Sequence, residues 1–174
     1  MKHISITSHK GGVGTTVIAT SLACYLVHKD HNVVLIDPSG DCARAMAGWE
    51  RPNFTVVPSI AEADSTADYI ISDGINIGGK EVIVVTNDYL CLSRTVTATD
   101  GRNRDGITYV VHEMPERALR VTDCEAVLGK GAIVVPDDSA IARVVDAGLL
   151  GERARSIQSL VDMATALIRE TATV

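Results

Sequence analysis

The sequence feature that most constrains this chain is a glycine-rich stretch, residues 8–16, which reads SHKGGVGTT. It lies between an alternating, β-prone run at residues 3–7 and an apolar-periodic segment at residues 17–28, which predict a strand and a helix. A glycine-rich turn between a strand and a helix is suited to hold a phosphate. Glycines let the backbone approach closely, and the free amides of the first helical turn point at the anion. The stretch therefore predicts a phosphate-binding loop.

This loop departs from the usual phosphate-loop pattern, G-x-x-x-x-G-K-[ST], at two positions. His9 stands where the first glycine is usual, and Thr15 stands where the lysine is usual. Thr16 supplies the hydroxyl that such loops use as a magnesium ligand. The nearest lysine comes earlier, at Lys10. The loop thus keeps its parts for binding a phosphate, while the lysine at the usual position is missing.

The length and composition predict a single domain, residues 1–174, with an aliphatic core. Apolar residues make up 46% of the chain and aromatic residues only 3%, so the core is built from Val, Ile, Leu and Ala, as in parallel sheets covered on both faces. The net charge of −6 does not favour a large nonspecific nucleic-acid surface, although DNA binding through a local basic patch stays open.

The cysteines and the start of the chain predict a cytoplasmic protein. The four cysteines are widely spaced and form no C-x-x-C pair, which disfavours a zinc site and fits free thiols in a reducing compartment. The first residues are too few and too polar for a signal peptide. No apolar run reaches the ~18 residues that a membrane span needs.

Strand patterns alternate with helix patterns along the rest of the chain. The expected strands are 33–36, 54–58, 68–73, 81–86, 107–112 and 132–136. The expected helices are 42–49, 89–98, 116–128 and 151–171. A further helix is expected to be capped by residues 137–139 and to end near residue 147. Ser59 is expected to cap a further turn, with Glu62 as its capping-box partner. Short β-branched strands alternating with helices predict a three-layer α/β fold with a mostly parallel sheet.

The last predicted helix carries an apolar stripe at helical spacing. We expect this stripe to pack on the domain's own sheet. A membrane or a partner is the alternative, although the acidic residues among its arginines make a weak lipid anchor. The stripe consists of Ile157, Leu160, Val161, Ala164, Leu167 and Ile168.

Two of the predicted strands end in an aspartate, at Asp37 and Asp73. Ligands bind at the C-terminal ends of the strands in an open parallel sheet, and the glycine-rich loop follows a strand end too. A phosphate loop with two carboxylates is the set that a nucleoside triphosphate and Mg²⁺ require. Thr16 and one aspartate would hold the metal, and the other aspartate would orient an attacking water.

Residues 10–16, KGGVGTT, resemble the deviant Walker A loop K-G-G-x-G-K-[ST] of the ParA/MinD family of P-loop ATPases. Residues 33–40 resemble the family's second strand and switch I, and residues 69–73 resemble its Walker B strand. Further matches are the next strand, at 80–87, and the last strand with the proline-containing loop near the nucleotide base, at 132–141. The resemblance extends from residue 3 to about residue 150 and implies a compact P-loop NTPase fold.

The resemblance also implies a site for ATP and Mg²⁺. Asp37 and Lys10 would be the catalytic residues, with Asp41 as an alternate for Asp37 in positioning water. His112 stands where the family tends to have an asparagine near the adenine, which leaves adenine or guanine open. The implied metal ligands are Thr16, Asp37 and Asp73, and the implied nucleotide contacts are Lys10, Gly11, Gly12, Val13, Gly14, Thr15, Thr16, His112, Pro136 and Asp137.

In this family the signature lysine, here Lys10, contacts phosphates across a nucleotide-sandwich dimer. The resemblance therefore implies a nucleotide-dependent homodimer with a protein partner or cargo. Thr15 points to the subgroup of CpaE/TadZ pilus-localisation proteins, whose loop often reads G-G-V-G-T-[ST]. Because Thr15 is neutral, the site lacks one cationic contact to the phosphates. This loss is expected to slow ATP hydrolysis by ~10²–10³, while nucleotide binding weakens less. The short interval between Thr16 and Asp73 implies that part of the switch region or a partner-binding helix is missing.

Three functions are consistent with this sequence. The first is an ATP-dependent positioning or partitioning protein whose hydrolysis is slow or absent. The second is a non-hydrolysing scaffold or binding module of the same fold. The third is a small-molecule kinase or synthetase, similar to dethiobiotin synthetase, for which the sequence offers no acceptor-binding motif. The cargo, and the choice among chromosome, plasmid and pilus systems, stay open.

Overall fold

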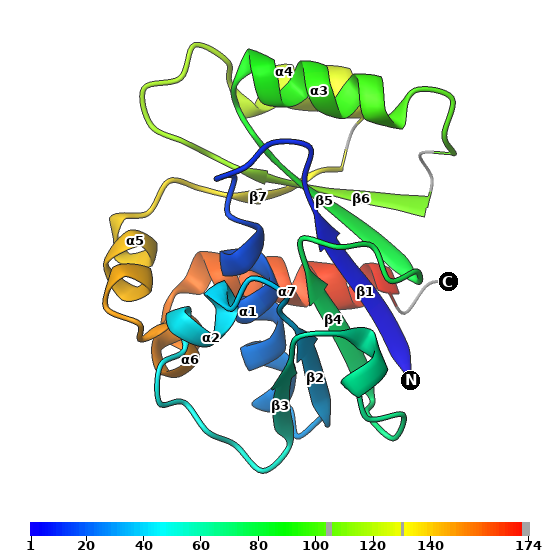
Figure 1. The fold of residues 1–174 in the computed structure, drawn as a ribbon. Coiled ribbons are helices and arrows are strands. Elements are labelled where there is room, and N and C mark those ends of the chain that lie inside the picture. Colours follow the sequence, from blue (N-terminus) through cyan, green and yellow to red (C-terminus); the bar gives the residue numbers. More distant parts are fainter. Residues whose placement is uncertain (104–105, 130, 172–174) are drawn as a thin grey trace.

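The computed structural model describes residues 1–103, 106–129 and 131–171. In these residues one seven-stranded sheet has the order β3-β2-β4-β1-β5-β6-β7, and every pair of neighbouring strands is parallel (Figure 1). The predicted α/β fold with a parallel sheet is therefore confirmed. Its strands are β1 (Lys2–Thr7), β2 (Val33–Ile36), β3 (Phe54–Val57), β4 (Tyr69–Asp73), β5 (Lys80–Thr86), β6 (Ile107–His112) and β7 (Ile133–Val135).

Helices cover the two faces of this sheet. Right-handed crossovers that run in opposite directions along a sheet place their helices on opposite faces. The step from β1 to β2 and the step from β5 to β6 are opposite in direction, so α1 and α3 lie on opposite sides (Figure 1). The helices are α1 (Thr15–Val27), α2 (Asp41–Ala45), α3 (Tyr89–Thr99), α4 (Val121–Leu128), α5 (Ser139–Asp146), α6 (Leu150–Arg153) and α7 (Gln158–Thr171), with 3₁₀ turns η1 (Ile60–Glu62) and η3 (Ala154–Ser156).

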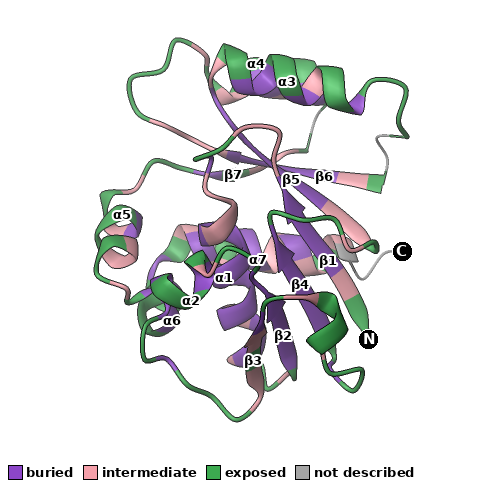
Figure 2. Cartoon of the chain, in the orientation of Figure 1, coloured by how far each residue is buried: buried purple, intermediate pink, exposed green. Residues whose placement is uncertain are grey.

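Helix α1 lies at the centre of the main core. Ile18 and Leu22 of α1 are fully buried, together with Ile4 and Ile6 of β1 and Leu35 of β2 (Figure 2). These aliphatic side chains are the core that the low aromatic content predicted. Burying one such side chain contributes about 1.5–3 kcal/mol, so this face fixes the position of α1 on the sheet.

The other face of β2 and β4 carries a smaller apolar cluster. Val34, Ile36 and Ile70 are buried there, and the partly buried side chains of Ala63 and Ile77 pack against them. Both covering residues come from the short connections on either side of β4. Short connecting segments therefore cover this face of β2 and β4.

Two predicted helices differ from the structure. The helix expected at 116–128 begins at Val121, because Glu116 adopts a left-handed conformation and the Asn87 side chain bonds the backbone of Met114 and Leu119. The helix expected at 151–171 is divided into α6, η3 and α7, because Ile157 is extended and buries its side chain.

Two short turns also differ from expectation. The helix expected at 42–49 ends at Ala45, because Met46 leaves the helical conformation and the Trp49 amide bonds its carbonyl at 2.8 Å. Ser59 precedes η1, but its hydroxyl bonds the Glu62 carboxylate at 2.9 Å instead of capping the backbone. The first helix is therefore shorter than expected, and Ser59 contacts its expected partner Glu62 without capping the backbone.

The apolar stripe of the last helix packs inside the protein, as predicted. Leu160, Ala164 and Leu167 are at most 1% exposed. Helix α7 contacts α1 and β7. Within the described residues, no helix is both long and apolar enough to cross a membrane.

The connection between β4 and β5 provides a matched test of packing against β1. Gly79 has a φ of +75°, and a Cβ there would lie 2.4 Å from the His3 carbonyl oxygen, whereas Gly78 has a φ of +84° and open space around it. We expect Gly79→Ala to lower the free energy of unfolding by about 2–4 kcal/mol, and Gly78→Ala by about 1–2 kcal/mol. Urea unfolding of both variants measures the difference, and equal losses would contradict this packing.

Candidate functional site

The phosphate loop, residues 8–16, begins where β1 ends and leads into α1. Val13 is 2% exposed and anchors the loop in the core, whereas Gly11 and Gly12 are exposed. Gly14 caps α1 with a φ of 97°, a left-handed conformation that favours glycine. The loop therefore has a buried anchor, an exposed glycine turn and a helix N-terminus in one short segment.

The side chain of His112, at the end of β6, contacts this loop. Its Nδ1 lies 3.0 Å from the Val13 carbonyl oxygen. A carbonyl only accepts hydrogen bonds, so this contact places the proton on Nδ1. A Cβ at Gly14 would lie 2.6 Å from the same nitrogen. A glycine is thus required at position 14, both because the backbone there is left-handed and because the His112 ring approaches closely.

Beside the loop, Thr16 and Asp73 meet at the predicted metal site. The Thr16 hydroxyl donates to Asp73 Oδ2 at 2.7 Å, and the Cys42 thiol donates to the same oxygen at 3.3 Å. Asp73 Oδ1 is buried and has no hydrogen-bond partner in the described part of the chain. A buried acceptor without a partner is costly, so this oxygen is suited to face a cation.

Asp37 completes the same cluster. One ligand atom each from Asp37, Cys42 and Asp73 lies within 4.8 Å of the others. Asp37 is 4% exposed and Asp73 is 7% exposed, so two carboxylates are buried close together. Two carboxylates and the Thr16 hydroxyl offer the hard oxygen ligands that Mg²⁺ prefers. The residues present therefore fit a magnesium ion.

The carboxylate of Asp37 also organises the turn that follows β2. Its Oδ1 accepts from the Asp41 amide at 3.1 Å and from the Ser39 hydroxyl at 3.1 Å, and its Oδ2 accepts from the Ala43 amide at 3.0 Å. These bonds hold the start of α2, which brings Cys42 to Asp73. Asp37 is thus an organiser of the site as well as the predicted catalytic residue.

Cys42 is a member of the cluster that sequence reasoning missed, because the four cysteines were expected only to be free thiols. All four are indeed buried and free. Burial, reinforced by the negative charge of Asp73, raises the pKa of the Cys42 thiol, so it stays protonated and donates. Its proximity to Asp37 in sequence was the available signal.

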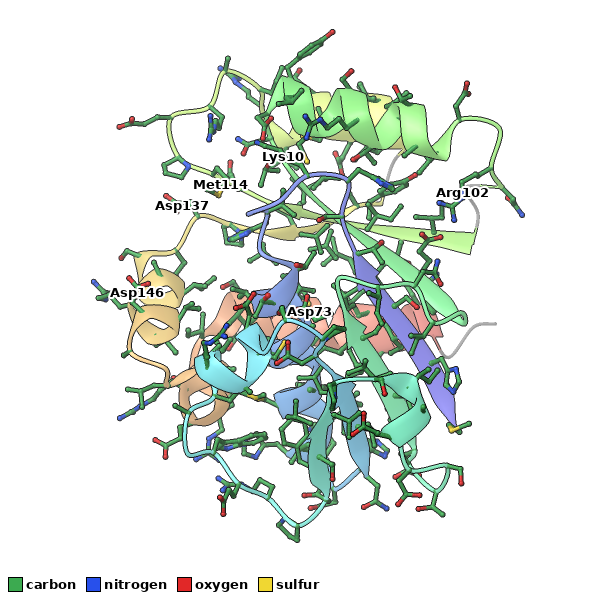
Figure 3. The ribbon with its side chains drawn as sticks, in the orientation of Figure 1. Lys10, Asp73, Arg102, Met114, Asp137 and Asp146 are labelled. Carbon is green, nitrogen blue, oxygen red and sulfur yellow. The ribbon has the colours of Figure 1, made fainter. Side chains whose placement is uncertain are left out.

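Lys10 points away from this cluster, toward α3 (Figure 3). Its Nζ forms an ion pair with Asp88 Oδ2 at 2.8 Å. Asp88 is the N-cap of α3 and also accepts from the Thr86 hydroxyl at 2.5 Å and the Cys91 amide at 2.9 Å. The only sequence signal for Asp88 was its place before a predicted helix. Lys10 is therefore held by a carboxylate of its own chain.

The remaining predicted contacts lie farther out. Pro136 and Asp137 are exposed in the connection between β7 and α5, where Asp138 caps the helix by accepting from the Ala140 amide at 2.8 Å. A cavity of about 540 Å³ opens beside Thr16, between α2 and α5, and Pro136 and Asp137 do not line it. Its lining is Thr16, Val17, Asp41, Arg44, Ala45, Val145, Asp146, Ala147 and Gly148.

The ion pair of Lys10 predicts a specific pH dependence of stability. Burial raises the pKa of Asp88, but the hydrogen bonds from Lys10, Thr86 and the Cys91 amide outweigh it and lower the pKa from 3.8 to about 2. A lowered folded-state pKa stabilises the fold above about pH 4, and this stability is lost as the pH falls toward 2.

We expect this contribution to be about 2 kcal/mol. Asp88→Asn should remove it and flatten the fall in stability between pH 4 and pH 2. Urea unfolding across this range provides the measurement, with exposed Asp146→Asn as the control. An unchanged pH profile in Asp88→Asn would contradict the role given to the ion pair.

Comparison with known proteins gives the family. The model of the CobQ/CobB/MinD/ParA nucleotide binding domain matches residues 4–173. A comparison with curated protein sequences found no significant match.

Solved structures share the fold at low sequence identity. The cell division ATPase MinD of Pyrococcus furiosus has a TM-score of 0.77 and 17% identity, with 97% of this chain and 98% of that chain covered. MinD of Pyrococcus horikoshii complexed with Mg-ADP has a TM-score of 0.75 and 16% identity, with 95% of each chain covered. The MinC:MinD complex of Aquifex aeolicus has a TM-score of 0.74 and 18% identity, with 97% of this chain and 96% of that chain covered. With its family model matched over nearly the whole sequence, the chain belongs to the CobQ/CobB/MinD/ParA nucleotide-binding domain family.

Proposed function

We propose that this protein binds ATP and Mg²⁺ as a single domain and acts as a ParA/MinD-like positioning or partitioning protein. The observation that carries the proposal is the hydrogen bond between Thr16 and Asp73, next to an Asp73 oxygen without a partner. It joins the phosphate loop to a strand-end carboxylate, as a metal-bound triphosphate requires. The family and its fold are consistent with this use of the site.

The parts of the proposed site have separate tasks. The loop amides and the N-terminus of α1 bind the phosphates. Thr16 and Asp73 hold Mg²⁺, which neutralises charge on the phosphates when it is bound. The cavity beside Thr16 and Val17 receives the nucleoside, and its volume of about 540 Å³ suits a ligand of that size. His112 keeps the loop in shape through Val13.

We further propose that the nucleotide promotes a homodimer. The Lys10 side chain bonds Asp88 in the single chain and would exchange this partner for phosphates in the dimer. A neighbour in fold was solved with Mg-ADP and another in a complex with MinC, which supports a nucleotide and a protein partner here. The proposed dimer presents one surface to such a partner or cargo.

A non-hydrolysing scaffold is the second candidate function. Two observations favour it: Thr15 is neutral where the lysine is usual, and the charge of Lys10 is compensated by Asp88. Both reduce the positive charge available to a transferring phosphoryl group. This candidate keeps nucleotide binding and dispenses with turnover.

Calorimetric titration with Mg-ATP tests the binding site. Hydrogen bonds to charged groups contribute about 1.5–3 kcal/mol, so Thr16→Val is expected to weaken Mg-ATP binding by about 10–100-fold. Thr66→Val, in an exposed loop, is the matched control and should bind normally. The mass of the protein in solution should double with Mg-ATP. A wild-type protein that binds no Mg-ATP would overturn the proposal.

Turnover measurements separate the two candidates. Thr15→Lys restores the usual cation and should raise ATP hydrolysis by ~10²–10³, whereas the neutral Thr15→Gln should not. Asp37→Ala should abolish any hydrolysis that the wild type shows. If the wild type and Thr15→Lys both fail to hydrolyse bound ATP, the scaffold function is supported. Fast wild-type hydrolysis that Thr15→Lys does not change would contradict the role given to Thr15.

A further inference from the structure

A basic cleft lies at the end of α1 that is farther from the phosphate loop. It is a cavity of about 400 Å³ between the end of α1, the chain after α2, and the α6–η3 region. Three arginines and one histidine line it together with a single acidic residue. The lining is His28, Arg51, Glu152, Arg153, Arg155 and Ser156.

The cations of this cleft lack carboxylate partners. Across the described ranges of the chain, Arg51, Arg153 and Arg155 form no ion pair. Instead, the Arg51 guanidinium donates to the Glu50 carbonyl oxygen at 2.8 Å and lies over the Trp49 ring at 5.2 Å. Like charges that line one cleft repel one another unless an anion joins them. In a chain with a net charge of −6, this cluster has the character of an anion site.

The positive potential of the cleft is visible at His28. Burial lowers the pKa of His28, and the charges of Arg155 and Arg51 lower it further. The Nε2 atom of His28 is buried and has no hydrogen-bond partner among the described residues. A histidine in this setting can donate to an anion that enters between the arginines.

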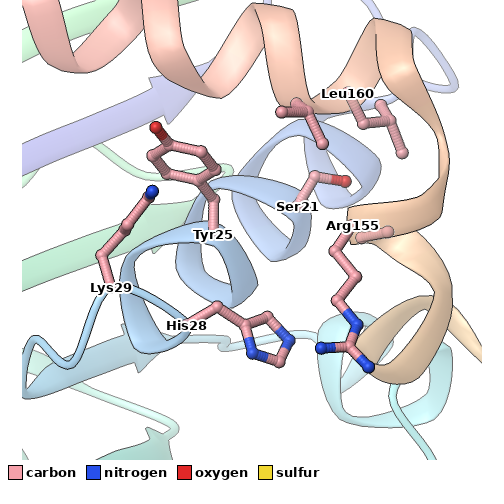
Figure 4. A pocket seen from close by; sticks show the side chains of 8 residues that line it. Ser21, Tyr25, His28, Lys29, Arg155 and Leu160 are labelled. Carbon is pink, nitrogen blue, oxygen red and sulfur yellow. The ribbon is translucent and has the colours of Figure 1, made fainter.

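A second, inner cavity of about 190 Å³ continues from the cleft and shares His28 and Arg155 with it (Figure 4). Tyr25 and Leu160 give it apolar walls. Ser21 also lines it, is 2% exposed, and has a hydroxyl without a partner in the described structure. Leaving such a group unsatisfied costs about 1–3 kcal/mol, so a ligand with a polar atom at this point would gain affinity.

We propose that the cleft binds an organic phosphate, with the phosphate group on the arginines and an apolar or aromatic body in the inner cavity. Guanidinium groups bind phosphate through paired hydrogen bonds, which explains why arginines gather here. Tyr25 and Leu160 pack on the body of the ligand, and the Ser21 hydroxyl bonds its polar atom. The combined shape suits a small molecule. This site is separate from the proposed nucleotide site, because no residue that lines the cleft or the inner cavity also lines the cavity beside Thr16.

Trp49 is the only tryptophan of the chain and contacts both Arg51 and His28, so its fluorescence reports on the cleft. We expect phenyl phosphate to change the Trp49 emission saturably, and inorganic phosphate to bind more weakly because it leaves the inner cavity empty. Arg155→Gln should weaken the binding of phenyl phosphate by about 10-fold or more. Arg94→Gln, an exposed arginine on α3, is the matched control and should bind normally.

Cross-tests distinguish the cleft from the phosphate loop. Thr16→Val should leave the phenyl phosphate response unchanged, and Arg155→Gln should leave Mg-ATP binding unchanged. In amide NMR spectra of the wild type, phenyl phosphate should shift residues 21–29, 49–53 and 153–161. These spectra test the site even if Arg155→Gln fails to fold.

Three results would overturn the proposal. The first is a Trp49 emission that does not change with phenyl phosphate. The second is a response that Arg155→Gln leaves intact or that Thr16→Val removes, which would place the anion elsewhere. The third is a short DNA duplex that binds the cleft more tightly than phenyl phosphate, which would identify a nucleic-acid surface instead.

Discussion

The hydrogen bond between the Thr16 hydroxyl and the Asp73 carboxylate is the contact on which the candidate site depends. It joins the start of α1 to the end of β4, two segments that are 57 residues apart in sequence. β1 lies between β4 and β5 at the centre of the sheet, so the loop after it opens beside both strands. The sheet order therefore brings the phosphate loop and the strand-end carboxylate into contact.

Buried negative charge is the second property of this site. Asp37 and Asp73 are nearly inaccessible, and burying a carboxylate is costly unless it is paired or hydrogen-bonded. Asp37 meets this cost with bonds to the backbone of α2, whereas one oxygen of Asp73 has no partner among the described residues. The two aspartates thus differ: Asp37 has hydrogen bonds to both oxygens and also organises the turn after β2, whereas one oxygen of Asp73 has no partner among the described residues.

The fold could be predicted from sequence because its signals are local. Short strands that alternate with helices are visible within windows of a few residues, and so is the glycine loop between the first strand and the first helix. The misplaced start of α4 shows where this fails, because Asn87 holds the backbone of Met114 and Leu119 from a distant strand end. No periodicity near residue 116 reveals that contact.

The candidate site was predictable to a similar degree. The loop, Thr16 and Asp73 follow from patterns, and the structure places Thr16 and Asp73 together. Asp88 and Cys42 were missed because their roles come from tertiary contacts to Lys10 and Asp73. The basic cleft was missed for the same reason, since its arginines come from separate segments that meet only in the folded chain.

The ion pair between Lys10 and Asp88 also affects how a nucleotide would arrive. A free lysine attracts an approaching anion over a Debye length of about 8–10 Å, whereas a paired lysine and aspartate act as a dipole whose field decays faster. The loop therefore offers little long-range attraction from its only lysine. Capture then depends on short-range contacts with the loop amides.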